Sequence, residues 1–371
     1  MHGGDVYNNT IQYDFSVNIN PMGVPEEIRT AMIRSLDYIE CYPEYDAGSL
    51  KRAISAKHGI SSDSIICGNG ASELISAICN AFVKEGSRVL VAGPAFSGYE
   101  RAAYAVNAEV IYSMADATED FNTSSALLED ILKNRPGLVF FANPSNPVGR
   151  LTDREFIYKL SVACKKVGAL LVVDECFIEL TGKEEEYSVL NGSHVVGNVI
   201  VLRAFTKSYA VPGIRLGYAV ILEAAGDEPI VSSDAATTGI RGSLAKRLVS
   251  VLPEWNISVM AMQAGMTALS LRGYIEASAS LIDRERRFVL EEIMRLGIKT
   301  YATEANYVLF YIDEKEPKGL YEFMRNRKIL IRDCSDYEGL GAGYYRVAIR
   351  THEENAMLVK ELGYYKESCD A

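Results

Sequence analysis

The sequence predicts an α/β fold, with a mainly parallel sheet in a large domain and a smaller α+β domain. Between about residues 65 and 222, short apolar runs alternate with helical patterns. The runs show little polar alternation, which is typical of strands that are buried on both faces of a parallel sheet. Polar residues capable of chemistry come directly after several runs, and open α/β sheets bind ligands in the loops at strand ends.

The elements of the large domain follow from these patterns in order. Residues 72–83 place apolar side chains on one helical face, which predicts a helix. The expected strands cover residues 88–92, 109–114, 138–142, 169–174, 199–203 and 216–221. Residues 223–252 fit no element well, and we interpret them as an atypical insertion, either a long loop or short helices.

After Pro253 the pattern changes to that of a smaller α+β domain. A long helical pattern covers about residues 258–294 and is interrupted near Arg272-Gly273. The strands expected after it cover residues 307–312, 329–332 and 344–349, and the last helix starts at about residue 353. We therefore expect a large domain of residues 26–257, and a small domain formed by residues 1–25 together with residues 258–371.

Composition excludes several classes of partner and site. The chain has 371 residues and a formal net charge of -11 without a compensating basic stripe, so we expect no nucleic-acid partner. No apolar stretch approaches membrane-spanning length, which predicts no membrane partner. Seven cysteines are scattered and never spaced as CxxC, which favours reduced thiols in the cytoplasm over disulfides or a zinc site. We interpret Cys176 as a small buried core residue.

Four features at the ends of the apolar runs are those that a pyridoxal phosphate site needs. They are an amine, an acid, an arginine and a glycine-rich helix start, at Lys207, Asp174, Arg215 and Gly68-Asn69-Gly70-Ala71-Ser72. The lysine forms a Schiff base with the cofactor, the carboxylate keeps the ring nitrogen protonated, and backbone amides hold the phosphate. Each feature alone has an ordinary alternative: a solvated lysine, a helix cap after the strand, or a chance Gly-x-Gly.

The chain resembles the fold-type I enzymes that use pyridoxal phosphate, in the branch of the histidinol-phosphate aminotransferases and the L-threonine-O-3-phosphate decarboxylases of cobalamin synthesis. The resemblance extends from His2-Gly3-Gly4 to residues 346–350, and about residues 223–250 lie outside it. The decarboxylases are the more similar of the two groups. The stretches that carry this likeness are HGG at 2–4, DFSVNINPMG at 14–23, the surroundings of Cys41-Tyr42-Pro43, and ILIRDCSDYEGL and YYRVAIR within 329–350.

The resemblance implies a cofactor role for each matching residue. Lys207 would bond to the cofactor and move a proton, Asp174 would pair with the ring nitrogen, and Asn146 would donate to the ring 3-oxygen. Phe96 would stack on the ring. The alternatives are an ordinary turn asparagine at 146, and a core role for Phe96 with Tyr99 competing for the ring. The implied phosphate ligands are Gly70, Ala71, Ser72, Thr206 and Arg215, with Tyr42 reaching the cofactor of the neighbouring subunit in a homodimer that shares its active sites.

Two positions depart from the usual pattern of this family. Residue 204 is alanine where a hydroxyl residue commonly binds the cofactor phosphate, so the affinity for the cofactor should be weaker unless Thr206, Ser72 or water substitutes. Residue 177 is phenylalanine, as in the decarboxylases, where the aminotransferases usually carry a tyrosine. The second departure favours decarboxylation over transamination.

Two arginines are the expected substrate ligands. Arg332 and Arg346 lie on neighbouring strand patterns, and two guanidinium groups suit a substrate that carries both a carboxylate and a phosphate. The resemblance adds His2, Gly3 and Asn18 from the N-terminal segment. A histidine so close to the chain end is otherwise more often disordered than functional. The expected partner is therefore a small phosphorylated amino acid.

Three functions are compatible with these residues. The first is a decarboxylase that converts L-threonine O-3-phosphate into (R)-1-amino-2-propanol phosphate for a corrinoid side chain, or O-phosphoserine into ethanolamine phosphate. The second is an aminotransferase of the histidinol-phosphate type, which needs 2-oxoglutarate or glutamate as co-substrate. The third is a degenerate binding protein, favoured by Ala204 and by the insertion of residues 223–252. That insertion would either lengthen a surface connection or cross the substrate entrance.

Overall fold

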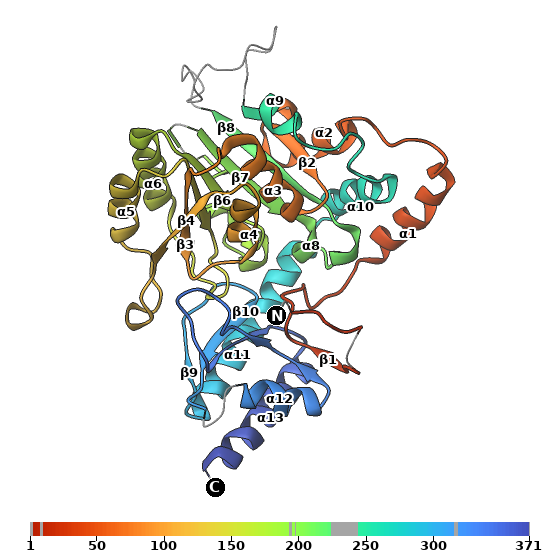
Figure 1. Cartoon of the computed structure of the whole chain (residues 1–371). Helices are drawn as coiled ribbons and strands as arrows, with labels where there is room; N and C mark the ends of the chain where they lie inside the picture. Colours follow the sequence, from red (N-terminus) through yellow and green to blue (C-terminus); the bar gives the residue numbers. More distant parts are fainter. Residues whose placement is uncertain are drawn as a thin grey trace.

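The computed structural model of the chain describes residues 3–7, 10–192, 195–196, 198–223, 244–314 and 318–370. A large α/β part lies above a smaller part that ends in the C-terminal helix (Figure 1). Among the described residues, no helix combines the length and the apolar composition that crossing a membrane requires. The predicted site residues belong to both parts, so they can form one site only where the two parts meet.

A seven-stranded sheet forms the centre of the larger part, in the order β2-β8-β7-β6-β5-β3-β4. Its strands are β2 (Ile65–Gly68), β3 (Arg88–Gly93), β4 (Glu109–Met114), β5 (Leu138–Ala142), β6 (Leu170–Asp174), β7 (Asn198–Ala204) and β8 (Gly217–Glu223). Strand β8 runs antiparallel to β2 and β7, whereas the pairs from β7 through β6, β5 and β3 to β4 are parallel. This confirms the predicted mainly parallel sheet. Strand β2 was not predicted, because four residues are too few to show a period.

Helices cover both faces of this sheet, because successive residues of a strand point to opposite sides. Val172 of β6 packs into one core and Val173 into the other, and both are fully buried. The helices of the first core are α3 (Ala71–Phe82), α4 (Gly98–Ala105) and α9 (Leu244–Val249). The helices of the second are α1 (Glu26–Arg34), α2 (Gly48–His58), α5 (Ala126–Asn134), α6 (Arg154–Val167) and α10 (Val259–Ser270). The short helices α7 (Glu184–Tyr187) and α8 (Phe205–Ser208) lie in connections.

The smaller part is built on a four-stranded sheet in the order β12-β13-β10-β9. Its strands are β9 (Lys299–Thr300), β10 (Tyr307–Tyr311), β12 (Arg332–Asp333) and β13 (Tyr344–Ala348). A parallel pair joins β1 (Tyr13–Asp14) to β11 (Ile329–Leu330), so the N-terminal segment lies against the C-terminal part. The helices α12 (Gly319–Asn326) and α13 (His352–Asp370) share a buried core with this sheet.

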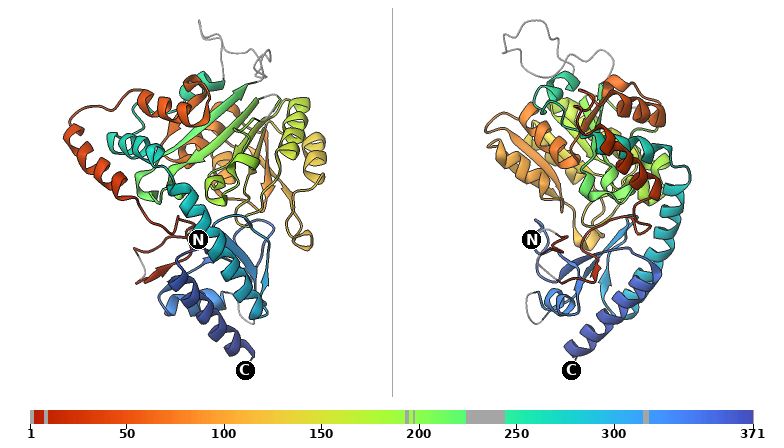
Figure 2. Two further views of the ribbon diagram at one scale, coloured as in Figure 1. Left: turned by 180° about the vertical axis from the view of Figure 1, so that it is seen from behind. Right: turned by 90° about the vertical axis from the view of Figure 1, so that its right-hand side faces the viewer.

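The long helical pattern after Pro253 consists of two helices, α10 and α11 (Tyr274–Arg295). The break falls at Gly273, whose φ of 76° is the left-handed conformation that glycine adopts easily. Helix α11 runs from the larger part to the smaller one (Figure 2). We propose that the large domain ends at about residue 257, and the path of α11 between the two parts supports this boundary. Of the predicted insertion, α9 is described and packs on α3, whereas residues 224–243 lie outside the described residues.

Candidate functional site

A pocket of about 240 Å³ lies between the ends of β5, β6 and β7, the start of α3, and the strands β12 and β13 of the smaller sheet. The predicted site residues that line it are Gly3, Asn18, Ala71, Ser72, Phe96, Asn146, Asp174, Thr206, Lys207, Arg215, Arg332 and Arg346. Gly70 adjoins this set, Tyr42 lies elsewhere on the chain, and His2 falls outside the described residues. The fold therefore brings together residues from both ends of the sequence.

Lys207 lies in α8, which begins directly after β7. Burial in the pocket and then the charge of Arg346 lower the pKa of Lys207 from its usual 10.5 to about 8. Arg215 acts in the same direction, and Cys176 and Asp14 oppose it. Much of this amine is therefore neutral in mildly alkaline solution, and the neutral amine is the form that attacks a carbonyl carbon.

Asp174 ends β6, and both oxygens of its carboxylate accept hydrogen bonds. Oδ2 accepts from the hydroxyl of Tyr99 at 2.6 Å, and Oδ1 accepts from the backbone N–H of Cys176 at 3.0 Å. These two hydrogen bonds fix the orientation of the carboxylate. A carboxylate on the wall of the pocket is the group that a protonated ring nitrogen needs as its partner.

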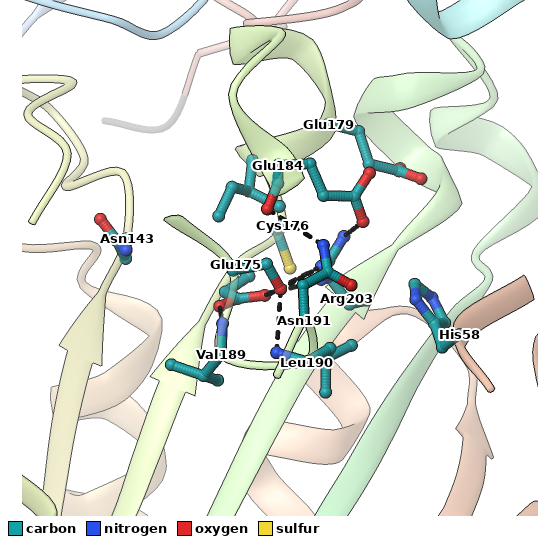
Figure 3. A network of polar contacts seen from close by, with 12 residues as sticks. His58, Asn143, Glu175, Cys176, Glu179, Glu184, Val189, Leu190, Asn191 and Arg203 are labelled. Atoms are coloured by element: carbon teal, nitrogen blue, oxygen red, sulfur yellow. Dashed lines mark hydrogen bonds and ion pairs between the residues drawn. The ribbon is translucent and has the colours of Figure 1, made fainter. Parts of the chain in front are cut away.

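A buried network of charged side chains joins the ends of β6 and β7 (Figure 3). Glu175 and Arg203 pair at 2.9 Å, with side chains that are 0% and 2% exposed. Arg203 also pairs with Glu184 at 2.9 Å. Because Asp174 precedes Glu175 and Lys207 comes four residues after Arg203, this network holds the two strand ends that carry the pocket's acid and amine.

The start of α3 forms a cradle that suits a phosphate. Gly70, which precedes the helix, has a φ of 82°, and a Cβ built there would lie 2.5 Å from Nη2 of Arg215. Glycine therefore allows the guanidinium group to lie against the first helical turn, whose N–H groups have no partner within the helix. An anion in this cradle would meet both the helix N-terminus and Arg215. Ala204 and Thr206 lie on the same wall of the pocket.

The structure separates the two aromatic residues that were candidates for stacking on the cofactor ring. Tyr99 is 2% exposed and packs flat on Phe140, with ring centroids 4.7 Å apart and an interplanar angle of 9°. Phe96 is partly exposed on the pocket wall, and its ring lies so close to Gly98 that a Cβ there would be 2.2 Å from it. This arrangement leaves Phe96 as the ring that can stack, and its role stays a prediction.

Arg332 and Arg346 lie directly opposite each other on β12 and β13, and each is 6% exposed. Like charges at opposite positions of neighbouring strands repel each other. Arg346 donates to the side-chain oxygen of Asn146 and, at 3.0 Å, to the carbonyl oxygen of Ser16. Arg332 pairs with Asp336 at 2.7 Å. Two buried guanidinium groups on one pocket wall form a site for anions.

Two buried polar atoms of pocket residues have no hydrogen-bond partner within the described part of the chain. They are the side-chain oxygen of Asn18 and Nε of Arg346. Buried polar atoms nearly always have partners, so this acceptor and this donor are placed to meet a ligand. Together with the cradle, the acid and the amine, they form a donor and acceptor set that fits pyridoxal phosphate and an anionic substrate.

Tyr42 does not reach the pocket of its own chain. Its side chain is 80% exposed, and its ring centroid lies 4.9 Å from that of Trp255. Tyr45 meets the same indole edge to face at 5.4 Å. The predicted contact of Tyr42 with a cofactor therefore depends on a second chain.

The pocket also contains residues to which the sequence analysis assigned no role. The hydroxyl of Tyr337 lies 3.4 Å from Nη1 of Arg346, and its ring centroid lies 5.0 Å from the guanidinium carbon of Arg332. Tyr337 belongs to the stretch ILIRDCSDYEGL, so the likeness of that stretch could have indicated it. Cys176 is partly buried and packs against one core of the sheet, as a small core residue would, and it also lines the pocket. The chain turns out of the sheet after Asp174, which brings Cys176 to the pocket wall.

Comparisons with known proteins give matches along nearly the whole chain. The sequence model of the family Aminotransferase class I and II matches residues 10–362. Threonine-phosphate decarboxylase of Salmonella typhimurium is 31% identical over 352 residues, which cover 94% of this chain and 90% of that protein. Histidinol-phosphate aminotransferase of Methanococcoides burtonii is 29% identical over 344 residues, or 92% and 87% of the two chains. The crystal structure of the histidinol-phosphate aminotransferase from Clostridium acetobutylicum is similar with a TM-score of 0.81 at 28% identity, and covers 96% of this chain and 100% of that one.

Proposed function

The chain belongs to the aminotransferase class I and II family, and on that basis we propose that it is a pyridoxal phosphate-dependent decarboxylase of a phosphorylated amino acid. The proposed substrate is L-threonine O-3-phosphate, and the products are carbon dioxide and (R)-1-amino-2-propanol phosphate for corrinoid synthesis. O-phosphoserine, which lacks one methyl group, is a variant of the same proposal. The observation that carries the proposal is the pair of opposed, buried arginines on β12 and β13.

The family depends on pyridoxal phosphate, which supplies an electron-withdrawing ring conjugated with the substrate's Cα. We assign Lys207 to covalent attachment and Asp174 to the ring nitrogen. Because the side-chain oxygen of Asn146 accepts from Arg346, its amide N–H group is left to donate to the ring 3-oxygen. The proposed ligands of the cofactor phosphate are Gly70, Ala71, Ser72, Thr206 and Arg215.

Two guanidinium groups match two anionic groups on one substrate. Arg346 offers its Nε, which has no partner among the described residues, and Asn18 lines the same space. Each hydrogen bond to a charged group contributes about 1.5–3 kcal/mol. Because Asp336 already pairs with Arg332, one anionic group of the substrate would meet this arginine beside Asp336 and the other would meet Arg346. We therefore assign a carboxylate and a phosphate to this pair, with Gly3 and Asn18 beside them and His2 as a further candidate.

The preference for decarboxylation is supported by Phe177. This ring lines the pocket and meets Tyr307 edge to face at 5.3 Å, and Nζ of Lys207 lies 5.9 Å from its centroid. Phenylalanine offers no hydroxyl at the position where aminotransferases of this branch usually carry a tyrosine. When the carboxylate leaves as carbon dioxide, the electron pair of the broken bond stays at Cα. Lys207 is the proposed donor of the proton that replaces the carboxylate there.

The alternative function is an aminotransferase of the histidinol-phosphate type. It is supported by the similarity to the Methanococcoides burtonii and Clostridium acetobutylicum proteins. An aminotransferase would need an oxo-acid acceptor, which a decarboxylase does not. A degenerate binding protein is the weakest of the three hypotheses, since the amine, the acid and both arginines line one pocket.

We also propose a homodimer with shared active sites in the cytoplasm. A band of exposed apolar and aromatic side chains supports the dimer, because a monomer seldom leaves so many together. The band follows α1 and the segment after it, and consists of Ile33, Leu36, Tyr38, Ile39, Tyr42 and Tyr45. In a dimer, Tyr42 could meet the partner's cofactor. All seven cysteines are free thiols, which supports a reducing compartment.

The test compares substrates under matched conditions. Protein saturated with pyridoxal phosphate is incubated with L-threonine O-3-phosphate, O-phospho-L-serine or histidinol phosphate, each with and without 2-oxoglutarate. We expect carbon dioxide and aminopropanol phosphate from the threonine ester without any oxo acid. If histidinol phosphate is the only one of the three substrates that reacts, and if it reacts only when 2-oxoglutarate is present, the proposal is contradicted and the protein is an aminotransferase. Faster turnover of O-phosphoserine would keep the reaction and correct the substrate.

A further inference from the structure

The acid of the pocket has a partner to which no role has been assigned so far. The hydroxyl of Tyr99 donates to Oδ2 of Asp174 at 2.6 Å, a short distance that is typical of an O–H bond to a carboxylate. The two residues are 75 positions apart in the sequence, and both line the pocket. Tyr99 therefore contacts Asp174 at the pocket wall.

The surroundings of Tyr99 leave its hydroxyl little freedom. Its ring is stacked on Phe140 and meets Phe96 edge to face at 5.7 Å, and its side chain is 2% exposed. The residue lies in the first turn of α4, whose core position on the sheet fixes the backbone. Burial and the neighbouring Asp174 raise the pKa of Tyr99 well above its usual range. The hydroxyl therefore stays protonated at neutral pH and can donate to Asp174.

We propose that Tyr99 is a positioning residue that keeps Asp174 ionised and thereby keeps the shared proton on the ring nitrogen of pyridoxal phosphate. The inference rests on the proposed role of Asp174. One proton lies between the carboxylate and the ring nitrogen, and the more basic of the two groups holds it. A hydrogen bond to the charged carboxylate makes that group less basic. When the Tyr99 hydroxyl is removed, we expect the N–H bond to break and an O–H bond to form on Asp174, while the electron pair of the N–H bond stays on the ring nitrogen.

The chain offers a matched control for this contact. Tyr112 also donates its hydroxyl to a carboxylate, that of Glu100, and it is partly buried, but neither residue lines the pocket. Tyr99→Phe removes the hydroxyl and keeps the ring that stacks on Phe140. Tyr112→Phe removes a hydroxyl–carboxylate bond of the same kind away from the pocket. Any effect specific to the first variant therefore belongs to Asp174.

The experiment is nitrogen NMR of the holoenzyme with cofactor that carries ¹⁵N in the ring. We expect the ring nitrogen of Tyr99→Phe to move toward the chemical shift of unprotonated pyridine, and that of Tyr112→Phe to match the wild type. We also expect kcat to fall roughly tenfold in Tyr99→Phe, with KM within about twofold, because one charge-assisted hydrogen bond is lost. Urea unfolding of the same samples reports how far each variant changes stability.

An unchanged ring-nitrogen signal in Tyr99→Phe, with only a lower unfolding midpoint, would overturn the inference and leave Tyr99 a structural residue. Asp174→Asn distinguishes this failure from a failure of the assignment on which it rests. If Asp174→Asn shifts the nitrogen signal and Tyr99→Phe does not, Asp174 is the partner and Tyr99 has no influence on the proton. If neither variant shifts the signal, the role proposed for Asp174 is wrong as well.

Discussion

Replacing Lys207 with methionine should stabilise the cofactor-free chain, because burial opposes the charge of this amine. The pKa of Lys207 falls from 10.5 to about 8 on folding, which corresponds to roughly 3 kcal/mol. Because the side chain keeps some contact with solvent, which screens its charge, we expect the substitution to raise the free energy of unfolding by only about 2 kcal/mol. Because the folded-state pKa lies below that of the unfolded chain, the full penalty applies below about pH 8. It disappears as the pH rises toward 10.5, where both states are neutral.

Urea unfolding followed by circular dichroism measures this effect at one protein concentration, at about pH 7 and at about pH 10. The free energy of unfolding of Lys207→Met should exceed that of the wild type by about 2 kcal/mol at neutral pH, and most of this difference should disappear at about pH 10. The control is Lys133→Met, at an exposed position in the last turn of α5, which should change stability by less than about 0.5 kcal/mol at either pH. Lack of stabilisation at neutral pH, or an advantage of equal size at both pH values, would refute the reasoning.

Three further variants test other parts of the account. Glu175→Gln should lower the free energy of unfolding by about 3–5 kcal/mol because Arg203 loses a buried partner, whereas replacing both residues by apolar ones should cost less. A double variant less stable than the single one in urea would contradict this. Ala204→Ser should lower the Kd for pyridoxal phosphate roughly two- to tenfold in absorbance titrations by adding a hydrogen bond, and weaker binding would disprove the idea that a hydroxyl is missing. Arg346→Gln should lower kcat/KM for the phosphorylated substrate roughly 10- to 100-fold in steady-state assays. The control Arg350→Gln changes an arginine outside the pocket and should leave kcat/KM unchanged. Equal losses in the two variants would contradict the anion site.

The sheet and most helices were predictable because their signals are local. Buried strands are continuous apolar runs, and the expected strands that follow the first helix agree with β3 to β8 within two residues at each end. The break near residue 273 was visible as a glycine inside a helical pattern. Asp174, Lys207 and Arg346 were expected from strand ends and from the resemblance to the family, and they line one pocket, while their roles stay predictions.

The contacts that tune the site were not predictable, because they join residues far apart in the sequence. Nothing near Tyr99 in the sequence indicates that its hydroxyl meets Asp174, because the two residues are 75 positions apart. The place of Cys176 on the pocket wall has the same origin, because a small residue type indicates burial in a core and does not show that the residue also lines a pocket. Tyr42 illustrates a third case, in which the predicted contact needs a second chain.

The proposed decarboxylation is tested most directly by following the atoms of one substrate. L-Threonine O-3-phosphate with ¹³C in the carboxyl group and ¹⁵N in the amine is incubated with cofactor-saturated protein in the presence of 2-oxoglutarate, and mass spectrometry locates both labels. We predict that ¹³C appears as carbon dioxide while ¹⁵N stays in aminopropanol phosphate. Transfer of ¹⁵N to glutamate, with ¹³C retained in the organic product, would contradict the account and identify an aminotransferase.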